Sequence, residues 1–329
     1  MNKGIKEILL WGGWLAIIFV FCKTKTFPVT IFSIFAWSFF IGILGSFFTR
    51  RKKSKKTVIR ADPRFDTPQK AVAAAFNHQI SSLLFLLNPF LTVQICLQSA
   101  GGIWEKFCGK PVFEAEKYAQ KTNYILPVAG EWRVFNGGVT KETSHSWSIP
   151  SQRFAYDLVK FGGNGRSFDG DGCSLENYFC FDAPILAPAD GVVVKVHDGI
   201  RDAPRVGTFW MDWLTRSLAG NFVLIKFAEN EYGLLAHLKR GSIIVKPGQT
   251  VKQGQEIGRC GNSGNSTEPH LHFQFQNGKS FYFNSGLPVK FSGFWRNDGE
   301  QKSFMERDYI SKGCFISSFE LMGQSRIAH

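Results

Sequence analysis

Residues 29–48 (VTIFSIFAWSFFIGILGSFF) carry no charged side chain over a length that matches the hydrocarbon core of a bilayer. An earlier charge-free run, residues 8–22, is slightly short for a full span. No small-residue cleavage pattern follows this first run, which disfavours a removable signal peptide. The two runs together predict a transmembrane helical hairpin.

Basic residues gather directly after the second run. Residues 49–56 (TRRKKSKK) contain six of them, in a chain whose net charge is +13. The positive-inside rule places this segment and the N-terminus in the cytoplasm. A nucleic-acid patch is the alternative. Beside a membrane span, topology and contact with anionic lipid explain the charge better, so we expect membrane lipid as a partner and no nucleic acid.

A third hydrophobic stretch, residues 81–97 (SSLLFLLNPFLTVQICL), is interrupted by Asn-Pro and by a glutamine. It fits either a kinked span or a helix in the membrane interface. We expect it to span, which places everything beyond about residue 100 outside the cytoplasm. The predicted organisation is a transmembrane hairpin with its basic segment (1–56), a connector (57–120), a β-domain (121–290) and a C-terminal tail (291–329).

From residue 124 onward, short alternating apolar segments are separated by Gly, Pro, Asn and Asp, as in ILAPADGVVVKVHDG and GSIIVKPGQTVKQGQEIG. Such segments with turn signals between them predict a mostly β domain. The tail contains a further strand or two and then an irregular end.

Residues 267–275 (TEPHLHFQF) place two histidines two positions apart in a strand-like run. Because strand side chains alternate between faces, His270 and His272 share one face and the intervening apolar residues line the other. Imidazole nitrogen is a ligand that zinc favours. Two ordinary polar residues on a strand edge are the alternative.

Two further residues complete a candidate site. His237 ends the apolar segment YGLLAHL, and Asp157 lies inside RFAYDLV. A carboxylate in such a strand is costly to desolvate unless a positive charge meets it, and a zinc ion would meet it.

These segments, with LLAHLKRGS, GNSG and PHLH as their most specific parts, resemble the lysostaphin/LytM-type zinc metallopeptidases. These are HxH endopeptidases that cut peptide cross-bridges in bacterial peptidoglycan. The resemblance covers residues 124–289. It implies an antiparallel, duplicated-hybrid-motif-like sheet or flattened barrel, a Zn²⁺ cofactor and peptidoglycan peptides as partners.

The resemblance also implies residue roles. Asp157 and His272 would be zinc ligands, and His237 and His270 would be the catalytic histidines. The family's usual first ligand, a histidine four residues before the aspartate, is Arg153 here. Arginine offers no lone pair. Either His145 replaces the missing ligand, or the domain is a non-catalytic relative that binds the wall or regulates another hydrolase.

We expect an active enzyme, since the other four site residues are all present. The expected protein is a membrane-anchored zinc metalloendopeptidase that hydrolyses peptidoglycan stem or cross-bridge peptides. It would be a multi-pass protein of the cell membrane with its catalytic domain on the extracytoplasmic side. A protein or bacteriocin-like substrate is a further alternative, and the sequence does not predict the oligomeric state.

Overall fold

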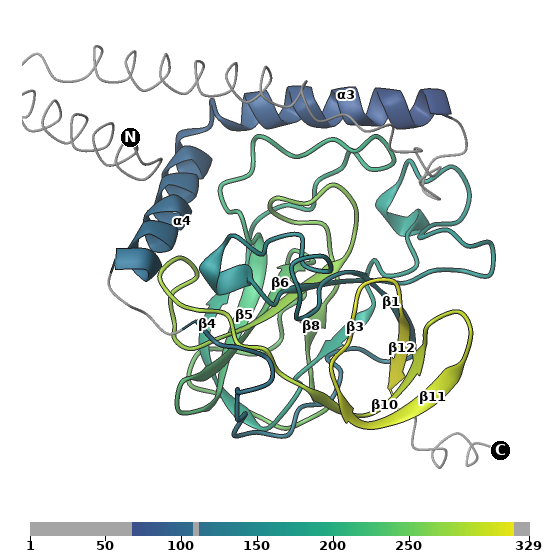
Figure 1. Ribbon diagram of the computed structural model, residues 1–329. Helices are drawn as coiled ribbons and strands as arrows, with labels where there is room; N and C mark the ends of the chain where they lie inside the picture. The colour runs from purple at the N-terminus through teal and green to yellow at the C-terminus, as the bar shows by residue number, and fades with distance from the viewer. Residues whose placement is uncertain (1–67, 108–111, 319–329) are drawn as a thin grey trace, which may run out of the picture. The chain divides into compact units, whose positions relative to one another are not determined.

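The computed structural model describes residues 68–107 and 112–318 (Figure 1). The predicted transmembrane hairpin and its basic segment, residues 1–56, lie outside the described residues and stay a prediction. Among the described residues, no single helix is both long and apolar enough to cross a membrane. Residues 73–85 and 89–107 pass that test only as a pair, which bends by 91°.

This pair belongs to helices α3 (Pro68–Phe85) and α4 (Pro89–Phe107). The bend occurs where proline lacks the N–H that would continue the first helix. Asn88 caps the second helix, because its Oδ1 accepts hydrogen bonds from the backbone N–H of Phe90 (3.0 Å) and Leu91 (3.4 Å). The stretch 81–97 therefore contains the end of α3 and the start of α4, which meet at this bend.

Both helices contact the β-domain. The Nδ2 of Asn88 donates to the carbonyls of Trp213 (2.9 Å) and Thr215 (2.7 Å). Leu91 is fully buried against Met211 and other apolar residues of the same loop. The bend is thus stabilised by the Asn88 cap of α4 and by the hydrogen bonds from Asn88 to the loop before β5.

The predicted mostly β, antiparallel domain is confirmed. Within the described residues, ten strands form one sheet in the order β11-β10-β12-β1-β2-β9-β6-β5-β4-β7, and β3 pairs with β8 in a second, small sheet. Every pairing between neighbouring strands is antiparallel. The strands are β1 (Glu131–Asn136), β2 (Tyr156–Val159), β3 (Pro184–Leu186), β4 (Gly191–His197), β5 (Asn221–Ala228), β6 (Glu231–Leu238), β7 (Thr250–Val251), β8 (Glu256–Arg259), β9 (Leu271–Gln276), β10 (Phe291–Asn297), β11 (Lys302–Asp308) and β12 (Phe315–Ser318).

The core lies on one face of the large sheet. Leu271, Phe273 and Phe275 of β9 are buried there against residues of the small sheet such as Ile185 and Ile257. The predicted alternation along β9 is therefore confirmed, and its polar residues occupy the opposite face, where the candidate site forms.

The C-terminal segment continues the same sheet. Strands β10, β11 and β12, the yellow arrows of Figure 1, lie beside β1, and β12 pairs directly with it. Because β1 in turn pairs with β2, these strands brace the strand that carries Asp157. Short 3-10 turns at Pro150–Gln152 and Leu175–Asn177 complete the described elements.

Candidate metal centre and active site

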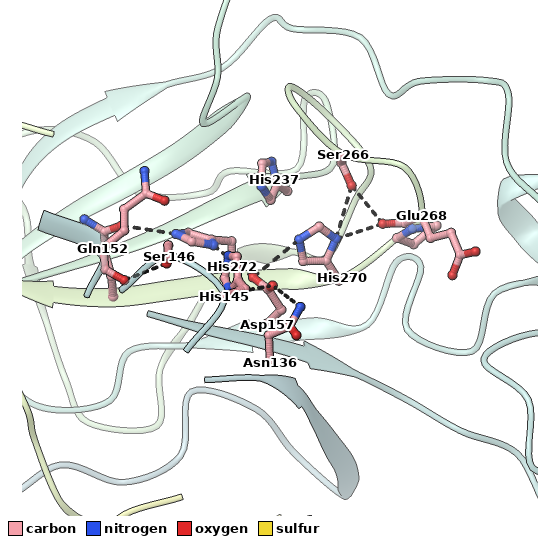
Figure 2. Close-up of polar contacts among 12 residues, drawn as sticks. Asn136, His145, Ser146, Gln152, Asp157, His237, Ser266, Glu268, His270 and His272 are labelled. Carbon is pink, nitrogen blue, oxygen red and sulfur yellow. Dashed lines mark hydrogen bonds and ion pairs between the residues drawn. The ribbon is translucent and has the colours of Figure 1, made fainter. Parts of the chain in front are cut away.

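Three neighbouring strands bring the predicted site residues together. Asp157 of β2 lies directly opposite His272 of β9, and His272 lies opposite Ala236 of β6, the residue before His237. The antiparallel register thus places an aspartate and two histidines at one end of adjacent strands. Figure 2 shows the four imidazoles gathered around Asp157.

His145, Asp157 and His272 form a group with the spacing of metal ligands. One ligand atom from each lies within 4.8 Å of the other two. The Oδ2 of Asp157 is 3.6 Å from His145 Nδ1, and its Oδ1 is 2.9 Å from His272 Nδ1. Two imidazoles and one carboxylate are a donor set that zinc takes when a fourth position stays open. The residues present therefore fit the metal that the resemblance implies.

Arg153, at the position of the usual first ligand, takes part in other contacts. Its guanidinium donates to the Glu105 carboxylate of α4 (3.1 Å) and to the Trp147 carbonyl (3.2 Å). Ser144 Oγ donates to the Arg153 carbonyl (2.8 Å), which folds the loop so that His145 faces Asp157. Of the two alternatives left open by the sequence, this geometry favours His145 as the third ligand.

A chain of amides orients His272. Its Nε2 lies 3.1 Å from Gln274 Oε1, Gln274 Nε2 donates to Gln276 Oε1 (2.7 Å), and Gln276 Nε2 donates to the Gly278 and Ser280 carbonyls. Since those carbonyls only accept, each amide points its oxygen towards His272. Nε2 of His272 therefore carries a proton, and the hydrogen bond between its Nδ1 and Asp157 Oδ1 (2.9 Å) needs a second proton on Nδ1, which a metal ion bound there would displace.

Sequence reasoning gave the two glutamines no role, although the alternation that pairs His270 with His272 also places them on that face. It also missed Asn136 of β1, whose Nδ2 donates to Asp157 Oδ2 (3.0 Å). The signal for Asn136 is the β1–β2 pairing, which no local pattern reveals.

His237 and His270 lie side by side, with ring centroids 4.7 Å apart. The Nδ1 of His237 is 2.7 Å from the Ser263 carbonyl, and that of His270 is 2.8 Å from the Glu268 carbonyl. Because a carbonyl only accepts, Nδ1 carries the proton in each neutral ring and Nε2 keeps its lone pair. The Nε2 of His270 is 3.7 Å from Asp157 Oδ1, at the edge of the metal-ligand group.

The shifted pKa values of His237, His270 and Asp157 suit proton transfer near neutral pH. Burial lowers the pKa of His237 well below its ordinary value and also lowers that of His270, so both rings are neutral. Burial opposes ionisation of Asp157, but the hydrogen bond with His272 and the neighbouring imidazoles outweigh it and hold the pKa of Asp157 below its usual range. The site thus presents one carboxylate and two neutral imidazoles with free Nε2 atoms.

Backbone strain marks the turn beneath His237. His237 has a φ of 59°, a left-handed conformation that is rare without glycine. Gly220, with a φ of 64°, packs on Ser263 so closely that a Cβ would lie 2.3 Å from the Ser263 carbonyl oxygen. That oxygen is the acceptor that orients His237. The GNSG segment is thus part of the support of a candidate catalytic residue.

We expect Gly220→Ala to lower the free energy of unfolding by about 2–4 kcal/mol, because it adds both backbone strain and a backbone clash. Gly241→Ala is the matched control, since Gly241 has a φ of 72° but nothing within 4 Å of the added Cβ. Urea unfolding of both variants measures the difference. Equal losses in the two variants would show that the contact with Ser263 contributes nothing.

A cavity of about 500 Å³ opens over these residues, and we call it the metal-site cleft. His78 of α3 and Gln98 of α4 also line it, so both helices reach the site. Its remaining lining residues are Asn136, His145, Ser146, Ile149, Gln152, Asp157, Phe209, Met211, Leu218, Ala219, His237, Asn265, Ser266, Thr267, His270, His272 and Phe281. No local pattern assigns His78 a role, because only the tertiary fold brings α3 to the cleft.

Part of the chain is similar in sequence to known peptidases. An uncharacterized metalloprotease of Haemophilus influenzae is 36% identical over 127 residues, covering 38% of this chain and 22% of the relative. The peptidoglycan DD-endopeptidase ShyC of Vibrio cholerae is 45% identical over 145 residues, covering 38% of this chain and 33% of ShyC. The chain therefore spans a third or less of the length of these curated relatives.

Among solved structures, a zinc-containing peptidase from Vibrio cholerae aligns with a TM-score of 0.32 and 22% identity, over 50% of this chain and 39% of that one. Residues 178–283 match Peptidase family M23. The match includes His237, His270 and His272, whereas His145 and Asp157 precede it, and the β2–β9 pairing brings Asp157 opposite His272. The resemblance to M23 metallopeptidases is confirmed: the chain carries a Peptidase family M23 domain.

Proposed function

We propose that the chain is a zinc metalloendopeptidase that hydrolyses peptide bonds in peptidoglycan stem or cross-bridge peptides. One observation carries the proposal: the ligand atoms of His145, Asp157 and His272 lie within 4.8 Å of one another, beside the free Nε2 atoms of His237 and His270. The substrate class is supported by the relative ShyC, which is named a peptidoglycan DD-endopeptidase.

The reaction needs a Lewis acid and a proton acceptor. His145, Asp157 and His272 would hold a zinc ion, and such an ion would supply the Lewis acid that lowers the pKa of water and polarises a carbonyl. His270 takes the proton of the attacking water at Nε2, and its Nδ1 stays hydrogen-bonded to the Glu268 carbonyl. The same Nε2 proton then passes to the amine that leaves.

The ring of His237 is held in the same way as that of His270, with Nδ1 hydrogen-bonded to a backbone carbonyl, here that of Ser263. In its neutral form its Nε2 is also a proton acceptor, so it donates to the developing oxyanion only after taking up a proton. Burial, which lowers its pKa, opposes that protonated form in the free enzyme. We assign His270 the role of base and His237 the stabilisation of the oxyanion, because the negative charge that develops on the oxyanion would favour the protonated form of the His237 ring.

Digestion of purified peptidoglycan tests the proposed reaction. The full chain in detergent, loaded with zinc, is expected to release soluble fragments with new amino termini, detected by mass spectrometry. Fragments with intact peptides would contradict peptide hydrolysis. Binding to the polymer without any cleavage would instead favour the alternative of a non-catalytic wall-binding relative.

We also propose that the chain is anchored in the cell membrane with its catalytic domain on the extracytoplasmic side. The charge-free runs of residues 8–22 and 29–48 and the basic residues 49–56 support this topology. The apolar surface of α3 and α4 also supports it, because lipid would cover apolar side chains whose exposure to water is unfavourable. The exposed large apolar residues described in these helices and in the turn between them are Phe76, Leu83, Leu87, Phe90, Val93, Ile103, Trp104 and Phe107.

Membrane fractionation and protease accessibility test the anchoring. The full chain is expected to stay in the membrane pellet after alkaline carbonate extraction. In spheroplasts, external protease should digest a tag placed after residue 329. Release by carbonate would contradict the span, and a protected tag would contradict the orientation.

A further inference from the structure

A second cavity, of about 830 Å³, lies beside the metal-site cleft on the same face of the large sheet. The two cavities share Ala219 and Phe281 in their linings. The backbone N–H of His237 donates to the Ala219 carbonyl (3.0 Å), so the shared wall directly adjoins a candidate catalytic residue. A chain-like substrate lying in the cleft would therefore extend into this second space.

Cations surround the second cavity, which we call the basic cavity. Lys195, Arg216, Arg240 and Lys279 line it, and none of them has a carboxylate partner among the residues that the structure describes. The one carboxylate in its lining, Asp198, accepts a hydrogen bond from the Gly241 backbone (2.8 Å). The cavity therefore has a clear excess of positive charge.

Arg201, a fifth cation of the lining, is neutralised by Asp212 through contacts of 2.8 and 3.0 Å. The metal-site cleft presents the opposite balance. Within the part of the chain that the structure describes, no lysine or arginine lines it, and its one acidic residue is Asp157. Among the side chains that line the two cavities, the cations without a carboxylate partner therefore lie in the basic cavity and not in the metal-site cleft.

The basic cavity is bounded by fixed elements. Its floor is apolar, with Phe222 and Leu224 from β5 and Leu234 from β6. One wall is fixed by Gln94 of α4, whose Oε1 accepts from the Leu218 N–H and from the Tyr282 hydroxyl, both at 3.0 Å. Positively charged side chains around an apolar floor suit a ligand whose carboxylates pair with the cations while its aliphatic part contacts the floor.

We propose that the basic cavity binds a carboxylate-bearing part of the same peptide whose scissile bond lies in the metal-site cleft, so that the enzyme selects acidic peptides over their amidated counterparts. This inference rests on the proposed function and names its substrate class. Lys195, Arg216, Arg240 and Lys279 are then residues that determine specificity, because they would pair with carboxylates that an amide replaces.

A matched pair of synthetic cross-linked peptides tests the inference. The two peptides differ only in free carboxylates or carboxamides on the residues that flank the scissile bond. The zinc-loaded full chain in detergent should cleave the acidic peptide with a kcat/KM roughly tenfold higher, mainly through KM, since single exposed pairs are weak but several act together. The preference should shrink at high ionic strength, because salt screens exposed charges.

The Lys195→Gln/Lys279→Gln double variant is expected to lose most of this preference. The control is Lys226→Gln/Lys246→Gln, which removes the same charge from exposed lysines that line neither cavity. Equal kcat/KM for the two peptides in the wild type would overturn the inference and leave the proposed function intact. So would a preference that survives in the Lys195/Lys279 variant.

Cleavage of neither peptide would defeat the proposed function instead. Calorimetric binding of both peptides to the zinc-loaded His270→Ala variant then decides the inference without catalysis. Tighter binding of the acidic peptide, lost when Lys195 and Lys279 are also replaced by glutamine, would support the basic cavity as its site. Equal binding of the two peptides would overturn it.

Discussion

Replacement of His270 by alanine is expected to lower kcat by roughly 10²–10⁴-fold, the usual contribution of a positioned proton acceptor. The imidazole lies 3.7 Å from Asp157 and its Nδ1 is fixed on the Glu268 carbonyl, so its Nε2 is held at the edge of the metal-ligand group. Zinc content should stay at the wild-type level, because the candidate ligands are His145, Asp157 and His272. Steady-state hydrolysis of a cross-linked peptide and metal analysis of the same preparation measure both quantities.

The unfolding midpoint of His270→Ala serves as the control for a structural effect. A variant that keeps most of the wild-type kcat would show that His270 is not the base. A variant that loses zinc as well would make it a ligand. His237→Gln separates the second role, because its side-chain amide can donate a hydrogen bond but cannot take up a proton: it should keep more activity than His237→Ala if His237 stabilises the oxyanion.

Asp157→Asn is expected to abolish zinc binding. The substitution keeps the size of the side chain and its hydrogen bond to β1, but it removes the negative charge that faces His145 and His272. His145→Ala should have the same effect, since two protein ligands hold zinc far more weakly than three. We expect about one zinc per chain in the wild type and almost none in either variant, measured by mass spectrometry of the purified protein.

Asp182→Asn is the matched control. Asp182 is an exposed aspartate paired with Lys239 (2.9 Å), and its φ of 65° is one that asparagine tolerates, so zinc should be retained. If His145→Ala keeps its zinc, the third ligand lies elsewhere and our assignment is wrong. If the wild type binds none, the wall-binding alternative becomes the better hypothesis.

Local pattern alone determined the class of the domain and most of the candidate site. Alternation along β9 is a property of neighbouring residues, so it predicted both the buried face and the histidine face. The cost of burying Asp157 in an apolar strand likewise singled it out before any partner was known. His237 was found because it ends an apolar strand. The structure brings these residues together, and each inference depends on the period of a strand or on the desolvation of a single group.

The tertiary structure decided what depends on contacts between distant segments. His145 faces Asp157 in a loop that the Ser144–Arg153 hydrogen bond closes, while the Arg153 side chain pairs with Glu105 of α4, and no spacing within residues 145–157 encodes that ion pair. The tautomer of His272 depends on two glutamines and the turn after β9. The basic cavity exists only where α4, β4, β5 and the turn after β9 meet. Side-chain orientation and the sum of charges around a space are set by packing, and packing joins residues that the sequence holds far apart.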